Sequence, residues 1–325
     1  MSADSCLADP AAQTLAKPAR AEPTRLFGAA AALFTVMLWA AGLVATRFGV
    51  TGTLSLWDVV FLRLALPALI LLPVLLRHPP RRPSSAAEQP RYPLVLAVLV
   101  AGSGLPFLLT SSGGMVFAPA AHAGALMPGS MPLFAALLAV LLLGERFTPS
   151  RRLGILLMLL GAIAVGGWQI LHDTGNTWRG DLMFVAAGAM WACYTIAMKK
   201  SGLGVWQAAA VVYVASFLAY APVYLLLDSR LLVAPLFEVG VQVFQSVASG
   251  LLSMAAYGFA VRRLGAASAA AFGALTPALT ALLAIPLLGE WPELATWAGI
   301  VAVSLGVALA NGAVSGYARS NQQKG

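Results

Sequence analysis

The chain reads PLFAALLAVLLLGE at Pro132–Glu145 and, 145 residues later, PALTALLAIPLLGE at Pro277–Glu290. The two stretches are identical at nine of their fourteen positions, and the same register continues to Gly154 and Gly299. Similarity at so long a period indicates a duplicated half-molecule, because solenoid repeats have periods of about 20–50 residues. We therefore predict two copies of one structural unit.

The composition places this duplicated unit in a membrane. Of the 325 residues, 60% are hydrophobic and 10% are charged, and the mean hydropathy is +0.84. A soluble domain carries about 25% charged residues. The chain is therefore predicted to be an all-α integral membrane protein that has the lipid bilayer as its surroundings.

Several other classes of protein are excluded by the same survey. The net charge of +8 does not indicate a nucleic-acid partner, because Lys and Arg occur in short clusters between apolar stretches. Cys6 and Cys193 are too few for a disulfide framework and have no zinc-binding spacing. Residues 1–25 lack the apolar core of a cleaved signal peptide, so the apolar stretch from Leu26 is expected to remain in the membrane. We expect no metal and no cofactor.

Ten stretches have the length and composition of membrane helices, each of which needs about 20 mainly apolar residues. The segment from Tyr92 to Gly144 contains no Asp, Glu, Lys or Arg, and as one helix it would be roughly 80 Å long. It must fold back, and we place its turn at Ser111–Gly114 with Pro119. The predicted spans are 26–46, 57–76, 93–113, 121–143, 153–170, 182–198, 205–227, 240–261, 266–288 and 294–314.

The basic residues predict the orientation of these spans, since Lys and Arg favour the cytoplasmic side. We expect the protein in the plasma (inner) membrane with both termini in the cytoplasm. In this orientation 16 of the 20 Lys and Arg residues lie on the cytoplasmic side. The four exceptions are Arg47, Arg63, Arg179 and Arg230.

Ten spans divide into five per repeat, and an odd number makes the second repeat enter from the opposite side. Glu145 then faces the cytoplasm and Glu290 the exterior, so the two five-helix repeats are inverted. The predicted organisation is a cytoplasmic tail (1–25), the first repeat (26–170), an external linker (171–181), the second repeat (182–314) and a cytoplasmic tail (315–325).

Weaker matches extend the duplication. Trp39 corresponds to Trp191 at an offset of 152, and Ser103–Gly104 corresponds to Ser249–Gly250 at an offset of 146. The offsets shrink between helices, as expected when loops rather than helices gain or lose residues.

Five segments together resemble the EamA repeats of the drug/metabolite transporter superfamily. They are LWAAGLVATR (38–47), FLR (61–63), MWACYTIAMKK (190–200) and the two copies that end in LLGE. The resemblance covers about 26–314. It implies ten helices, a central cavity between the halves and export of small metabolites, often amino acids, with the aromatic amino acid exporters as the most similar type.

Aromatic and hydroxyl side chains are the candidates for binding a small-molecule substrate. Trp39 and Trp191 lie in mid-helix, where an indole N–H needs a partner or a cavity to line. Hydroxyls could satisfy an amide or ammonium group, although bonds to the backbone of their own helix are the commoner use. The predicted binding residues are Trp39, Ser103, His122, Trp191, Tyr194, Ser249, Ser253, Tyr257 and Thr276.

The charged residues near helix ends allow two interpretations each. His122 either faces the headgroups or external vestibule, or lines the cavity. Arg63 either extends to the interface, with Asp58 or headgroups as partner, or holds a substrate carboxylate. Glu145 and Glu290 are each expected to bond backbone N–H groups in a turn, with a role in gating as the alternative.

No Asp or Glu lies deep in a predicted span. The sequence therefore favours facilitated flux, driven by the gradient of the substrate itself, over coupling to protons. His122 is the first alternative as a coupling group.

Three classes of function remain to be weighed. A secondary carrier for neutral or zwitterionic metabolites is favoured. A membrane-embedded enzyme would need paired Asp residues or a His with a carboxylate, and no predicted span contains either. A channel would need a filter motif or a ring of charges. We therefore predict no catalytic residues.

Overall fold

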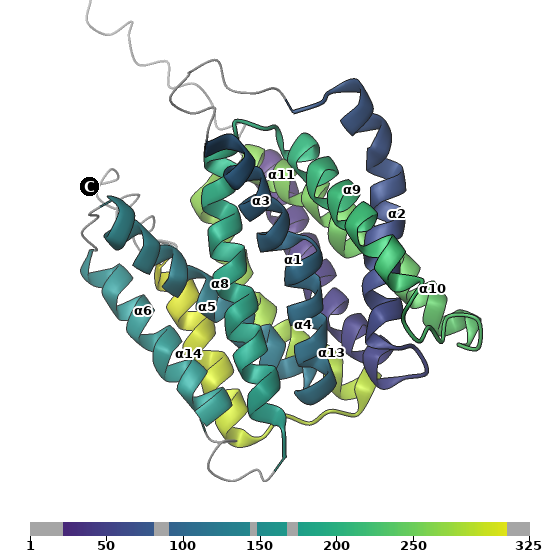
Figure 1. Cartoon of the computed structure of the whole chain (residues 1–325). Helices are drawn as coiled ribbons and strands as arrows, with labels where there is room; N and C mark the ends of the chain where they lie inside the picture. The colour runs from purple at the N-terminus through teal and green to yellow at the C-terminus, as the bar shows by residue number, and fades with distance from the viewer. Residues whose placement is uncertain (1–21, 81–90, 144–147, 168–174, 311–325) are drawn as a thin grey trace, which may run out of the picture.

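The computed structural model describes residues 22–80, 91–143, 148–167 and 175–310, and all its regular elements are helices (Figure 1). Nine helical segments of this described part are long and apolar enough to cross a membrane, and Leu294–Ala310 is a shorter apolar helix. The chain is a multi-pass membrane protein. Glu145 lies outside the described residues.

The first half contains five helical segments, two of which change their winding within the membrane. Its elements are α1 (Glu22–Thr51), α2 (Leu56–Arg77), α3 (Tyr92–Ser103), α4 (Leu105–Phe117), α5 (Ala120–Leu143), α6 (Pro149–Ala162) and the π-helical η3 (Ile163–Gly167). Gly104 separates α3 from α4, where Pro106 cannot donate a backbone hydrogen bond. The hydroxyl of Ser216 accepts the free N–H of Leu105 at 3.0 Å.

The described part of the second half also contains five helical segments. Its elements are α8 (Thr177–Ser201), α9 (Val205–Tyr224), α10 (Leu236–Gln245), the π-helical η4 (Ser246–Leu252), α11 (Ser253–Leu264), α12 (Ala266–Phe272), the 3-10 turn η5 (Gly273–Leu275), α13 (Thr276–Leu288) and α14 (Leu294–Ala310). The polar residues Thr177–Asp181 form the first turn of α8, within the stretch 171–181 that the sequence assigns to the linker.

Of the turn predicted at Ser111–Gly114 with Pro119, only the position of Pro119 is correct. Ser111–Gly114 are helical within α4, and the chain turns at Ala118–Pro119. The two glycines serve helix packing instead. A Cβ added at Gly114 would lie 2.6 Å from the ring of Phe184, so α4 could not approach α8 as it does with a larger residue there.

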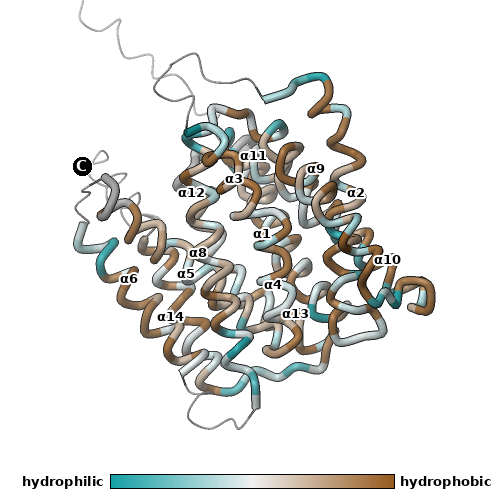
Figure 2. Tube along the Cα trace, viewed as in Figure 1, coloured by the Kyte–Doolittle hydropathy of each residue, from teal (hydrophilic) through white to brown (hydrophobic). Residues whose placement is uncertain are grey.

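The outer surface of the bundle is apolar. Along α6 and the start of η3, half or more of the surface is exposed at Leu153, Leu156, Leu160 and Ile163. Figure 2 shows α6 as mainly hydrophobic, with hydrophilic residues mostly near the two ends of the bundle. A continuous apolar surface of this kind suits lipid, because water would disfavour it.

The main contacts of the first helix of each half are related by exchange of the two halves. The first helix α1 packs against α11 and α13 of the second half, and its counterpart α8 packs against α3, α4 and α5 of the first half. The remaining helices pair with their own counterparts, α2 with α9 and α6 with α14, which lie side by side in Figure 1.

The counterpart helices α1 and α8 run in opposite directions. Arg47, near the end of α1, donates a hydrogen bond to the carbonyl of Met115 in α4. Gly180, at the start of α8, packs against the carbonyl of Gly114 in the same turn of α4. We call this side of the bundle the Glu290 end: α1, α4 and α13 end there, and α5 and α8 begin there.

Glycines of the duplicated register allow α6 and α14 to meet at backbone distance. A Cβ added at Gly154 would lie 2.7 Å from the carbonyl oxygen of Gly306, and one added at Gly306 would lie 2.7 Å from that of Gly154. Gly161 and Gly299 show the same reciprocal approach, at 2.8 and 2.7 Å. The register that reveals the duplication is therefore also a helix-packing contact.

Candidate functional site

Trp39 and its contacts form a first cluster, between α1 and α11. The indole Nε1 donates a hydrogen bond to Ser253 Oγ at 3.2 Å, and its ring lies 5.5 Å from that of Tyr257. Ser253 in turn donates to the carbonyl of Ser249 at 2.5 Å. The indole N–H of the half-buried Trp39 therefore has a hydrogen-bond partner.

Trp191 forms the second cluster, between α8 and α4. Its ring lies 5.3 Å from Phe107 and 5.1 Å from Tyr194. Ser253 and Phe107 are 146 residues apart, which is the offset that relates the third helix of one half to that of the other. The two tryptophans thus meet equivalent positions, one polar and one aromatic.

Three contacts at helical spacing join α1 to the continuous segment α10–η4–α11. Trp39 meets Ser253. One turn further along, a Cβ added at Gly42 would lie 2.8 Å from the Cβ of Ser249. The third contact is a hydrogen bond from Gln245 Nε2 to Thr46 Oγ1 at 3.4 Å. Ser249 and Ser253 both donate to backbone carbonyls of their own helix.

The other predicted residues lie in separate surroundings. Ser103, half-buried, ends α3 beside Gly102, where an added Cβ would lie 2.7 Å from the Cβ of Tyr194. Thr276 is buried at the start of α13, and its carbonyl accepts the hydroxyl of Thr280 at 2.8 Å.

A cavity of about 320 Å³ opens between α1 and the segment α10–η4. Gly42, Gln245 and Ser249 are part of its lining, whereas neither tryptophan is. The structure therefore brings the predicted residues into two clusters and does not join them in this cavity.

His122 is buried and paired with a carboxylate. Its Nδ1 lies 2.8 Å from Asp181 Oδ1, and the two side chains are only 3% and 8% exposed. The headgroup-facing interpretation of His122 is wrong. The expectation that a His–carboxylate pair is absent is also wrong, because Asp181 is near a helix end in sequence but is enclosed where α5 packs against α8.

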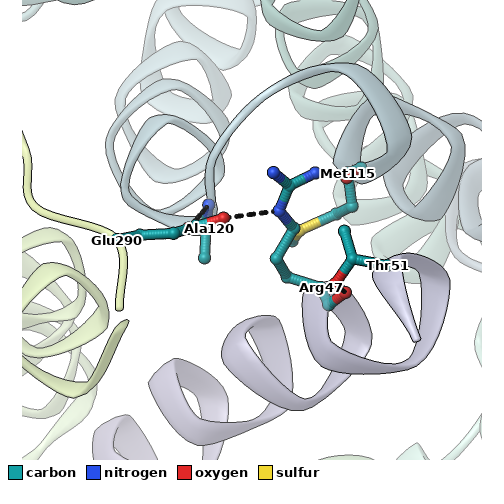
Figure 3. Close-up of polar contacts among 5 residues, drawn as sticks. All are labelled: Arg47, Thr51, Met115, Ala120 and Glu290. Atoms are coloured by element: carbon teal, nitrogen blue, oxygen red, sulfur yellow. Dashed lines mark hydrogen bonds and ion pairs between the residues drawn. The ribbon is translucent and has the colours of Figure 1, made fainter. Parts of the chain in front are cut away.

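At the same end of the bundle, Arg47 forms an ion pair with Glu290, with 2.6 Å between Nε and Oε1 (Figure 3). The other oxygen of Glu290 accepts the backbone N–H of Ala120 at 2.9 Å. Glu290 does bond a backbone N–H, as predicted, but at the first residue of α5 rather than in its own turn. The pair ties α1, α4, α5 and the end of α13 together.

Sequence reasoning did not single out Arg47 as a functional residue. A signal was available, because Arg47 is one of four basic residues outside the predicted cytoplasmic clusters.

Arg63 contacts Thr46, not Asp58. Its Nη1 donates to Thr46 Oγ1 at 2.7 Å, and no carboxylate of the described residues lies within 4.0 Å of its guanidinium. Asp58 is instead fully bonded, accepting from the hydroxyl of Tyr224, that of Ser229 and the N–H of Arg230. Arg63 is thus a cation inside a predicted span. Among the described residues, its side chain forms one hydrogen bond, to the neutral hydroxyl of Thr46.

Among the described residues, no group of three or more His, Cys, Asp or Glu side chains could hold a metal ion.

Comparison with known proteins agrees with this architecture. The model of the EamA-like transporter family matches residues 26–167 and 178–312. A curated relative, the probable terminal-alkyne amino-acid exporter of Streptantibioticus cattleyicolor, is 28% identical over 310 residues, which cover 91% of this chain and 97% of the relative. A crystal structure at 18% identity has the same fold, with a TM-score of 0.59 over 89% of this chain and 97% of its own. With a family match to both halves, the chain belongs to the EamA-like transporter family.

Proposed function

We propose that this family member is a secondary carrier that exports small neutral or zwitterionic metabolites, most of all amino acids with apolar or aromatic side chains. The relative's name as a probable amino-acid exporter supports the substrate class. The observation that carries the proposal is the pair of tryptophan clusters, which occupy equivalent positions on the two halves.

Alternating access by ten spans in two inverted repeats, 26–170 and 182–314, follows from this arrangement. The opposite directions of α1 and α8 and the exchange symmetry of the packing support it, because two equivalent halves can take each other's conformation. Both termini are then cytoplasmic in the plasma (inner) membrane, and the Glu290 end faces outward.

In this proposal the substrate lies between the two halves. Trp39 and Trp191 form the walls against which its apolar side chain packs, and Tyr194 and Tyr257 extend them. Ser103, Ser249, Ser253 and Thr276 supply oxygen atoms for its ammonium group. Arg63 supplies the charge for its carboxylate, because a guanidinium binds a carboxylate through two parallel hydrogen bonds.

The enzyme alternative is less well supported even though a His–carboxylate pair exists. Nucleophilic catalysis needs a hydroxyl or thiol hydrogen-bonded to the histidine. Within the described ranges, the only side chain bonded to His122 is that of Asp181. A channel is disfavoured because the Arg47–Glu290 ion pair and the buried His122–Asp181 pair join the helices at the Glu290 end, where an open pore would need to pass.

The experiment is counterflow in proteoliposomes. Vesicles loaded with a mixture of unlabelled L-amino acids are diluted into a trace of the labelled mixture, with protein-free vesicles as control. A carrier gives transient, saturable accumulation of label. A channel gives entry without overshoot, and an enzyme gives neither; either result contradicts the proposal.

A further inference from the structure

The pair His122–Asp181 has a polar atom that its surroundings do not satisfy. Oδ1 of Asp181 contacts His122 at 2.8 Å, but Oδ2 is buried and has no hydrogen-bond partner among the described residues. A Cβ added at Gly166 would lie 3.3 Å from Oδ2, so the carboxylate faces a glycine of the π-helical turn η3. Buried acceptors without partners are rare and costly, and π-helical turns are frequent at functional sites.

The charge of this pair depends on a single proton. With Asp181 ionised and His122 neutral, the carboxylate can only accept, the imidazole donates Nδ1–H to it, and the pair carries one negative charge. Adding one proton at Nε2 gives an imidazolium beside a carboxylate, and the pair becomes neutral overall. Burial disfavours a net charge, so a bound proton changes the energy of packing α5 against α8.

Few other charges face the pair. Arg47 lies on α1 and Glu290 lies just after α13, and these two form an ion pair in which their charges neutralise one another. On α8, Arg179 is exposed and stacks on Trp178. The parts of α4, η3 and α14 that pack here contain no Asp, Glu, Lys, Arg or His, and Glu293, directly before α14, is exposed. His172 and Asp173 belong to the stretch 168–174, outside the described residues.

The first turn of α5 connects the pair to the closure of the Glu290 end. Ala120 donates its N–H to Glu290, and His122, two residues further, contacts Asp181. Opening this end by separating α5 from the end of α13 therefore moves the helix that holds the imidazole.

We propose that His122 and Asp181 form the proton-binding site through which a pH gradient drives export, an inference that rests on the proposed carrier function. With the Glu290 end open, the substrate leaves and one proton from outside binds His122 at Nε2. The neutral pair then packs α5 on α8, with Ala120 bonded to Glu290 as in the structure, and this arrangement closes the Glu290 end. The proton leaves Nε2 for the cytoplasm when the opposite end opens, so one proton enters for each substrate that leaves.

The test uses the full-length protein in proteoliposomes with the labelled L-amino-acid mixture, under two conditions. Counterflow at equal pH measures the carrier alone. Uptake into vesicles with an acid interior and no internal substrate measures coupling, since at one proton per substrate the accumulation limit is about tenfold per pH unit of gradient. The wild type is expected to show counterflow and also accumulation driven by the pH gradient. The accumulation should be lost when the pH gradient is collapsed.

The variant Asp181→Asn is expected to keep counterflow and to lose accumulation, because the amide leaves no carboxylate beside His122 to stabilise a bound proton. The variant His122→Gln is expected to lose accumulation, because it removes the group that binds the proton. Glu238→Gln is the matched control: it changes another carboxylate at the same end, one that accepts the N–H of Thr53 at 2.9 Å. It should keep both activities.

If uptake by the wild type does not depend on the pH gradient, the proton-coupling inference is overturned. Counterflow at equal pH would still support the carrier proposal in that case. Accumulation that persists in a folded His122→Gln or Asp181→Asn protein also overturns it. If counterflow is absent, the carrier proposal fails, and the coupling inference fails with it.

Discussion

Arg47 and Glu290 form an ion pair of 2.6 Å between positions 243 residues apart, and so join the first helix of one half to the end of the fourth helix of the other. Both side chains are less than one-fifth exposed. Each of the two therefore depends on the other for its charge partner in the closed Glu290 end.

We expect Arg47→Gln and Glu290→Gln to destabilise the protein individually and to show a coupling of roughly 0.5–3 kcal/mol in a double-mutant cycle, as residues in one network do. Thermal unfolding of the purified protein in detergent measures it. Strict additivity of the two substitutions would show that the pair contributes no interaction energy.

A second prediction concerns the contact between α6 and α14. Gly306→Ala and Gly161→Ala place a methyl group against a backbone carbonyl, and overpacking of this kind costs about 1–3 kcal/mol. Gly240→Ala is the control, because a Cβ there meets no atom within 4 Å. In a helix that substitution should be neutral or stabilising by about 0.5–1 kcal/mol. Equal unfolding temperatures for all three variants would contradict the close packing.

The helices were predictable because each depends on a local property of the sequence: length and apolarity specify a membrane helix. The spacing of Gly154 and Gly161 places both on nearly one face, but the helix that they meet is distant in sequence. The break at Gly104 and the position of the turn were not predictable in this way. Whether Ser111–Gly114 bends or packs depends on Phe184, which is distant in sequence.

The candidate site was less predictable because its contacts are long-range. The sequence identifies Trp39 and His122 as notable, but not that they meet Ser253 and Asp181, which lie 214 and 59 residues away. Distance from a helix end was a poor guide to burial for Asp181. The premise that no buried carboxylate is available for protons therefore does not hold.

A third prediction tests the orientation of the two halves. Single cysteines at Lys200 and Glu290, in a protein without Cys6 and Cys193, should react with an impermeant thiol reagent from opposite sides of the membrane. Lys200 is expected to be cytoplasmic and Glu290 external, because the basic clusters favour the cytoplasm. Labelling of both from the same side would contradict the inverted repeats.

A fourth prediction concerns Arg63. If it binds a substrate carboxylate, Arg63→Met should lower the affinity for the preferred amino acid roughly ten- to hundredfold, from the 1.5–3 kcal/mol of a hydrogen bond to a charged group. The amine that lacks only the carboxylate should lose much less. Competition of both compounds against labelled substrate measures this, with Arg63→Lys as the variant that keeps the charge. An equal loss for both compounds assigns Arg63 to helix packing.

The last prediction separates a substrate-binding wall from a packing contact at the two tryptophans. Removing a large apolar side chain from a binding wall costs roughly 1–3 kcal/mol of ligand packing. At about 1.4 kcal/mol per decade, Trp39→Ala and Trp191→Ala should weaken apparent affinity about five- to hundredfold, with protein abundance near normal. Trp206→Ala is the matched control, since it truncates a tryptophan of α9 that is 44% exposed and belongs to neither cluster. Folded protein and substrate affinity are measured together in each variant. Reduced abundance with unaltered affinity in both tryptophan variants would make them packing residues, as their contacts with Tyr257 and Phe107 also permit.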